Sequence, residues 1–208
     1  MKQPCLSRGE QDLFSFNRLS GVKVENPMLR SGLAFAGANA WLQGKLLPNE
    51  AGKGLVFAQD VAALDLWATE LAVLSACNTA MGDIKIGEGV FGLRRAFAVA
   101  GAKTLVMSLW SVPDRATALL MERFFTNLQQ GLGRADALQD AQNYIRTITV
   151  KELQQSSLGL AVLEELQGLT SQDYQFCQET RPLEHPYFWG AWVCQGDTTA
   201  MVKSQSWN

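Results

Sequence analysis

Short apolar runs alternate with amphipathic stretches along the middle of the chain. The runs at residues 70–76 (ELAVLSA) and 103–110 (KTLVMSLW) each end at polar turn residues, a pattern typical of buried strands. Between them, apolar residues recur at helical spacing over 90–100, and Gly101 follows where a helix C-terminus favours glycine. This region therefore predicts a strand, a helix and a second strand.

The alternation continues in the second half of the chain. Ser111 and Asp114 fit a capping box for a helix that ends near Gly131, and a further helix is predicted over 134–148. The run at 188–195 (FWGAWVCQ) predicts a third strand. The helix that ends near Gly131 carries the apolar residues Ala116, Leu120, Met121, Phe124, Phe125 and Leu128.

Weaker patterns flank these elements. Small residues over 31–40 predict a short strand that runs into a loop, and the glycines and prolines over 43–54 predict a loop. Short helices are predicted over 59–64, with Leu64 on its apolar side, and over 158–166.

Strands that alternate with helices predict a layered α/β fold with a largely parallel sheet. In such sheets, ligands bind outside the carboxyl ends of the strands. Two polar turns, at 77–89 and 111–114, occupy that edge in the predicted fold. Candidate chemistry is therefore sought in these two turns.

Composition and charge narrow the possible functions. The chain has 208 residues, enough for one domain, and its net charge of −2 gives no electrostatic case for nucleic acid or an anionic membrane. We see no secretory signal and no apolar run near the ~20 residues of a membrane helix. Four cysteines without a C-x-x-C pair favour a reducing, cytoplasmic setting. A single histidine rules out a multi-histidine metal site, and we expect neither metal nor cofactor.

Cys77 is the first candidate for chemistry, because it ends a predicted buried strand and faces a glycine-rich loop. As a nucleophile it would need a cation or base to lower its thiol pKa, and otherwise it is a packed strand-end residue. The motif Gly87-x-Gly89-x-x-Gly92 is a weak nucleotide signal, because it begins ten residues beyond the strand and Glu88 would repel phosphate.

Two further positions allow both a structural and a functional interpretation. Asp114 is either the capping partner of Ser111 or, with Trp110, part of a pocket at the strand end. His185 lies in a loop before the third strand, where a structural role is the commoner one. Spacing favours the cap for Asp114, and a loop histidine such as His185 is more often structural or solvated than catalytic.

The stretch LSACNTAMGDIKIGEGVFGLRRAFAVAGAKTLVMSLWSVPD, residues 74–114, resembles the CHAT domain, a caspase-like module often found with tetratricopeptide repeats. Segments at 26–39, 133–142 and 185–197 (HPYFWGAWVCQGD) extend the resemblance. It implies a caspase-like, three-layer α/β/α sandwich with a mostly parallel sheet. The resulting division is an irregular segment at 1–25, a partial CHAT domain at 26–197 and a tail at 198–208.

The resemblance also implies a cysteine endopeptidase site. Cys77 matches the family nucleophile, and Asp114 matches an acidic residue that shapes the pocket for the side chain before the scissile bond, where it would favour a basic group. The family's catalytic histidine lies in an upstream His-Gly motif, whose glycine N–H also contributes to the oxyanion hole. No histidine precedes Cys77, and His185 matches a late H-P-Y-F-W turn instead.

We therefore expect an N-terminally incomplete CHAT domain that lacks its first strands, either a piece of a larger protein or the product of a decayed gene. One hypothesis is a cysteine endopeptidase subdomain, inactive as this chain alone, that acts on polypeptides. A second is a non-catalytic interaction module that binds a protein partner, such as the tetratricopeptide-repeat region of the same full-length protein, through an exposed sheet edge. A third, a small-molecule or nucleotide enzyme, rests on the glycines alone.

Overall fold

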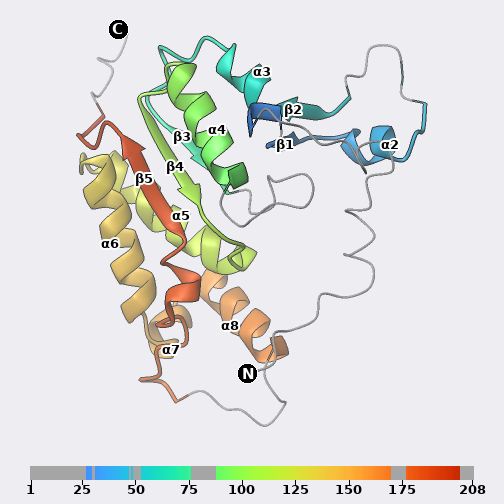
Figure 1. The fold of residues 1–208 in the computed structure, drawn as a ribbon. Coiled ribbons are helices and arrows are strands. Elements are labelled where there is room, and N and C mark those ends of the chain that lie inside the picture. Colours follow the sequence, from blue (N-terminus) through green and yellow to red (C-terminus); the bar gives the residue numbers. More distant parts are fainter. Residues whose placement is uncertain are drawn as a thin grey trace, which may run out of the picture. The chain divides into compact units, whose positions relative to one another are not determined.

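The computed structural model of the chain forms two compact units, one from residues 1–68 with 78–102 and one from 69–77 with 103–208. Figure 1 shows their elements. The residues that the structure describes are 27–29, 31–46, 48, 53–75, 88–169 and 177–201.

The first unit contains a small antiparallel pair of strands. β1 (Gly32–Ala34) pairs with β2 (Leu55–Phe57), and α2 (Ala38–Leu42) follows β1. Gly54 immediately precedes β2 and has φ 68°. A Cβ at this position would lie 2.4 Å from the backbone nitrogen of Ala38, so the position requires glycine. The strand expected within 31–40 is confirmed, whereas β2 escaped prediction because three residues are too few to show alternation.

Two helices of the first unit, α3 (Ala58–Ala62) and α4 (Glu88–Val99), pack against each other and against the 3₁₀ helix η2 (Pro27–Leu29). The helix expected over 90–100 is therefore confirmed. The helix expected over 59–64 ends earlier, and Leu64 is half exposed rather than part of a buried stripe.

Gly101 terminates α4 as the sequence predicts. It has φ 99°, its N–H donates to the Ala98 carbonyl at 3.2 Å, and the Ala102 N–H donates to the Phe97 carbonyl at 3.1 Å. This pair of hydrogen bonds is the Schellman motif, which favours glycine at the left-handed position.

The second unit is built on a three-stranded sheet in the order β3 (Ala72–Leu74), β4 (Thr104–Ser108) and β5 (Trp192–Gly196). β3 and β4 are parallel, but β4 and β5 are antiparallel. The prediction of an α/β fold is confirmed, but the described sheet is parallel only in part, because one of its two pairings is parallel and the other is antiparallel. The chain enters β5 at the carboxyl end of β4, with Trp192 opposite Ser108, and it must therefore run antiparallel.

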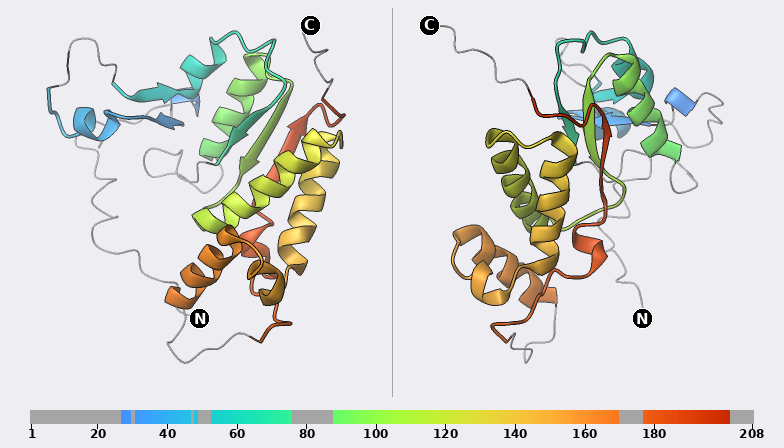
Figure 2. Two further views of the ribbon diagram at one scale, coloured as in Figure 1. Left: turned by 180° about the vertical axis from the view of Figure 1, so that it is seen from behind. Right: turned by 90° about the vertical axis from the view of Figure 1, so that its left-hand side faces the viewer.

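Helices α5 (Asp114–Gln129), α6 (Arg134–Thr147), α7 (Val150–Leu153) and α8 (Ser157–Leu169) connect β4 to the 3₁₀ helix η3 (Pro186–Phe188), which precedes β5. α5 and α6 form an antiparallel pair beside the sheet, and α8 packs on α5 (Figure 2). The predicted helices at 134–148 and 158–166 are confirmed.

None of the described helices is long and apolar enough to cross a membrane.

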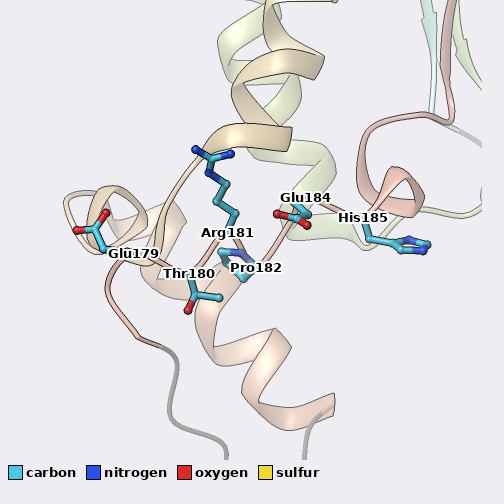
Figure 3. Close-up of a pocket in the computed structure, with 6 residues that line it drawn as sticks. All are labelled: Glu179, Thr180, Arg181, Pro182, Glu184 and His185. Carbon is cyan, nitrogen blue, oxygen red and sulfur yellow. The ribbon is translucent and has the colours of Figure 1, made fainter.

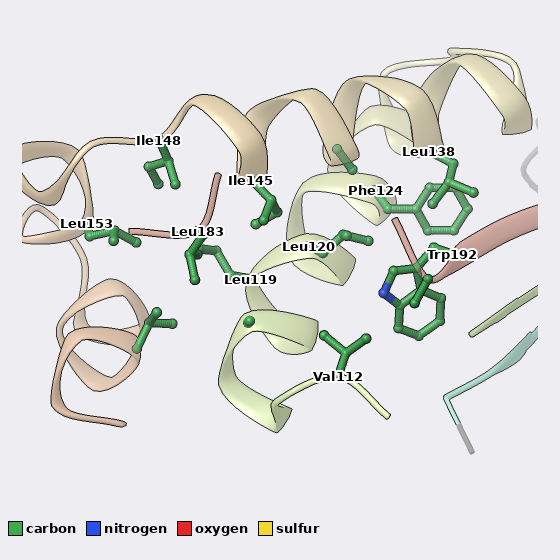
Figure 4. Close-up of a cluster of buried hydrophobic side chains, with 14 of the residues drawn as sticks. Val112, Leu119, Leu120, Phe124, Leu138, Ile145, Ile148, Leu153, Leu183 and Trp192 are labelled. Carbon is green, nitrogen blue, oxygen red and sulfur yellow. The ribbon is translucent and has the colours of Figure 1, made fainter. Parts of the chain in front are cut away.

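The core of this unit lies between α5, α6, α8 and the sheet (Figure 4). β4 is buried along its whole length, and Val106 joins the cluster from the sheet. Near the sheet, Phe124 and Trp192 fill the core, and Ile148 and Leu183 lie at its other end. On α5, Leu119 is buried as well, whereas Phe125 is 44% exposed.

The capping box expected from Ser111 to Asp114 is not formed. Pro113 occupies the N-cap with ψ 138°, no side chain caps the helix, and Asp114 is its first residue. Because the proline holds an extended ψ, the helix begins two residues later than a Ser111 cap requires.

A buried arginine joins the far end of the sheet to α6. The Arg134 guanidinium is 1% exposed, forms ion pairs with Glu70 and Asp197, and donates to the Thr199 carbonyl at 3.0 Å. Glu70 also pairs with Lys103. These contacts attach the start of the predicted tail to the folded unit.

Candidate functional site

The predicted nucleophile, Cys77, lies outside the described residues. β3 ends at Leu74, and the description stops at Ser75, two residues before Cys77. The site is therefore built from the neighbouring described segments at the carboxyl edge of β3 and β4.

The turn after β4 exposes two large apolar side chains at this edge. Leu109 is 41% exposed and Trp110 is 37% exposed. The Leu109 N–H donates to the Ala191 carbonyl at 2.9 Å, and the Trp110 indole Nε1–H donates to the Tyr187 carbonyl at 3.1 Å. These hydrogen bonds join two segments beside the strand ends, and Trp110 and Tyr187 are 77 positions apart in the sequence.

Asp114 lies four residues after Trp110 and opens α5, with its side chain exposed. A carboxylate in the first turn is stabilised by the positive end of the helix dipole. Within the described part of the chain, no hydrogen bond or ion pair connects Asp114 to Trp110. Their shared role in a pocket stays a prediction.

His185 caps η3. It is exposed, and its Nδ1 accepts the backbone N–H of Tyr187 at 3.2 Å. The accepted hydrogen bond uses the lone pair of Nδ1, so in the neutral ring the proton is on Nε2. While this hydrogen bond is made, the Nδ1 lone pair of His185 is engaged by the backbone.

Sequence reasoning missed two residues that organise this edge. Gln142 on α6 donates from Nε2 to the Trp189 carbonyl at 2.9 Å and to the Trp192 carbonyl at 3.0 Å. Tyr187 is 44% exposed and supplies the carbonyl that receives the Trp110 indole. Gln142 ends the family-like segment at 133–142, but that segment does not reveal its role, because its partners are backbone atoms of a distant turn.

An open depression of about 780 Å³ lies along the segment that leads into η3. Its lining comes from one stretch of chain, as Figure 3 shows: Glu179, Thr180, Arg181, Pro182, Glu184 and His185. Their side chains fan outward rather than converging on one point. The depression therefore holds no arrangement of nucleophile, base and oxyanion donors.

The described thiols and carboxylates do not form a metal site. Cys177 is exposed, while Cys194 on β5 is partly buried, and burial raises the pKa of its thiol. In the part of the chain that the structure describes, no three histidine, cysteine or carboxylate side chains gather as a metal site.

Comparison with known proteins supplies the family. The model of the CHAT domain matches residues 14–197. Tetratricopeptide repeat protein 28 of Homo sapiens is 33% identical over 93 residues, and its Mus musculus counterpart is 32% identical over 93 residues. Each alignment covers 45% of this chain but 4% of the relative, and no solved structure matches. The chain belongs to the CHAT domain family.

Proposed function

We propose that this chain carries the nucleophile side of a CHAT-type cysteine endopeptidase site without a general base, so that it does not hydrolyse peptides by itself. Cys77 stands at the nucleophile position, and a polypeptide would lie along the carboxyl edge of β3 and β4. Trp110 and Asp114 would line the pocket for the side chain before the scissile bond, with Asp114 favouring a basic group.

One observation carries this proposal. His185 is the only histidine of the chain, and its Nδ1 is engaged with the Tyr187 N–H in the cap of η3. A cysteine without a nearby base or cation keeps an ordinary thiol pKa and is mostly protonated near neutral pH. From the family resemblance we also propose a caspase-like sandwich, in which the edge of β3 and β4 is retained as a binding surface.

A peptide-cleavage assay tests this proposal. The purified chain is incubated with mixed peptide libraries that carry a lysine, arginine or apolar residue at each position, and products are read by mass spectrometry. We expect no cleavage above that of a Cys77→Ala control. Cleavage that Cys77→Ala abolishes would show that the chain supplies its own base, and a parallel His185→Ala variant would reveal whether His185 is that base.

A second candidate function is a non-catalytic interaction module, which the sheet and the relatives favour. β3 stands at one end of the strand order, so one of its edges has no partner among the described strands. Such an edge can pair with another chain. The named relatives are tetratricopeptide repeat proteins, and we propose that this domain works beside a repeat region of that kind.

Size-exclusion chromatography with light scattering tests the second candidate. Self-association through a sheet edge predicts a dimer or larger species that dissociates on dilution. A monomer at all concentrations that also fails to retain a repeat domain on the column would count against it.

A further inference from the structure

The turn between residues 184 and 190 is closed by its own hydrogen bonds. The Trp189 indole donates to the Glu184 carbonyl at 3.0 Å, and the Gly190 N–H donates to the Pro186 carbonyl at 2.7 Å. A Cβ on Gly190 would lie 2.9 Å from that same carbonyl oxygen, so the close approach requires glycine. With the His185 cap, these bonds give the segment a defined shape.

This turn is fastened to the core at its C-terminal end by Gln142. The amide of Gln142 donates to the carbonyls of Trp189 and Trp192, one at the end of the turn and one at the start of β5. Gln142 is itself partly buried on α6, whose neighbouring positions Leu138 and Ile145 are in the core. The anchor is therefore a core helix rather than another loop.

The turn presents one carbonyl to the edge of the sheet. The Tyr187 carbonyl accepts the Trp110 indole N–H at 3.1 Å, which fixes the direction of an indole that is 37% exposed. The exposed Tyr187 ring lies in the same turn. The orientation of Trp110 thus depends on where the turn is held.

We infer that Gln142 is a positioning residue for Trp110, acting through the turn at 184–190. The inference rests on the proposed function, in which Trp110 lines the pocket at the peptide-binding edge. Gln142 would give this side chain a fixed orientation. A wall held in place before the ligand arrives loses less side-chain entropy on binding. Gln142 touches neither the ligand nor the reacting atoms in this scheme.

The test follows the indole N–H signals in a nitrogen-15 correlation spectrum of the intact chain. Trp110→Phe removes one signal and so assigns it. In Gln142→Met, which keeps the side-chain length but has no donor, we expect the Trp110 indole signal to move and to exchange faster with water. The matched control is Gln139→Met on the exposed face of α6, which should leave that signal in place.

Gln142→Glu supplies a second variant in case Gln142→Met folds poorly. A protonated carboxyl group can donate to one of the two carbonyls, whereas an ionised one would repel both. We expect the Trp110 signal of this variant to approach the wild-type position as the pH falls through the pKa of the introduced group. A purely structural glutamine would change stability without this pH-dependent return of the signal.

The inference is overturned if the Trp110 signal stays at its wild-type position in both variants while the chain is folded. It is equally overturned if Gln139→Met moves that signal as far as Gln142→Met does. Neither result bears on the missing general base, because peptide cleavage reports on Cys77 and the indole signal does not. The two proposals therefore fail separately.

Discussion

Arg134 is a charged residue that is almost fully buried. It is 1% exposed, yet the carboxylates of Glu70 and Asp197 that neutralise it remain 41% and 42% exposed. Burial of an unpaired guanidinium would be costly, and two carboxylates with one backbone carbonyl offset that cost here. The arginine joins the start of α6 to the amino end of the parallel strands and to the chain after β5.

Replacing Arg134 should destabilise the second unit. In Arg134→Met the carboxylates can be hydrated, so we expect the free energy of unfolding to fall by roughly 1–3 kcal/mol, the cost of lost charged hydrogen bonds. Urea denaturation followed by circular dichroism measures the change. Arg115→Met, at an exposed site on α5, is the control and should stay within about 0.5 kcal/mol of wild type.

The carboxyl group of Asp140 should make stability depend on acid pH. Its pKa lies below the ordinary value because Arg123 and Asn127 donate hydrogen bonds to it, each at 2.7 Å. A lowered folded-state pKa stabilises the fold above the unfolded pKa of about 4, and this contribution is lost as pH falls through the folded pKa.

We therefore expect the free energy of unfolding of Asp140→Asn to fall less steeply below about pH 4 than that of wild type. Urea titrations between pH 3 and 7 provide the comparison. Glu164→Gln, at an exposed position on α8, is the control and should keep the wild-type slope. Parallel curves for wild type and Asp140→Asn would contradict this assignment.

At the scale of the element, two glycines that follow helices have nearly the same φ but different surroundings. Comparing them separates the cost of backbone strain from the cost of a steric clash. Gly101 after α4 has φ 99°, and Gly131 after α5 has φ 93°. A Cβ on Gly101 would lie 2.9 Å from the Trp67 ring, whereas a Cβ on Gly131 would meet nothing within 4 Å. Alanine therefore adds backbone strain at both positions and a steric clash at only one.

We expect Gly131→Ala to cost roughly 1–2 kcal/mol, the penalty for a left-handed alanine. Gly101→Ala should cost more, or else displace Trp67, which is 74% exposed and has room to move. Urea denaturation gives the costs, and tryptophan fluorescence reports the displacement. Equal costs with unchanged fluorescence would mean that the Trp67 contact is not formed in solution.

The long amphipathic helices could be predicted from the sequence, whereas two of the short elements could not. The periodic stretches that became α4, α5 and α6 were predicted to within a few residues, because burial on one face repeats over several turns. β2 and α7 were missed, because they have only three and four residues and lie in stretches without a clear apolar pattern, unlike the equally short β1 and β3. The start of α5 was misplaced because Pro113 fits both a first turn and an N-cap.

The candidate site was predictable only where it depends on sequence motifs. Trp110 and Asp114 follow a recognisable strand, so their place at its end was foreseeable. The partnership of Trp110 with Tyr187 was not, because it joins a side chain to a backbone carbonyl across 77 positions. The role of Gln142 depends on the same long-range geometry and had no local signal.

At the scale of the whole molecule, β4 organises the second unit. All five of its residues are buried, and it pairs with β3 on one side and β5 on the other. Its carboxyl end therefore brings the turn of Trp110 next to the turn of Tyr187, and β3 ends at the same edge. In the proposed function, this edge binds the polypeptide, while the one histidine of the chain caps a turn.

The protonation of Cys77 tests this account most directly. The rate of its alkylation by iodoacetamide is followed from pH 5 to 10 by peptide mass spectrometry, with the exposed Cys177 of the same chain as internal standard. We expect the Cys77 rate to rise with an apparent pKa near that of an ordinary thiol, about 8.5. Rapid labelling of Cys77 at pH 6, slowed by His185→Ala, would contradict the account, because it would reveal an activated thiolate with His185 as its base.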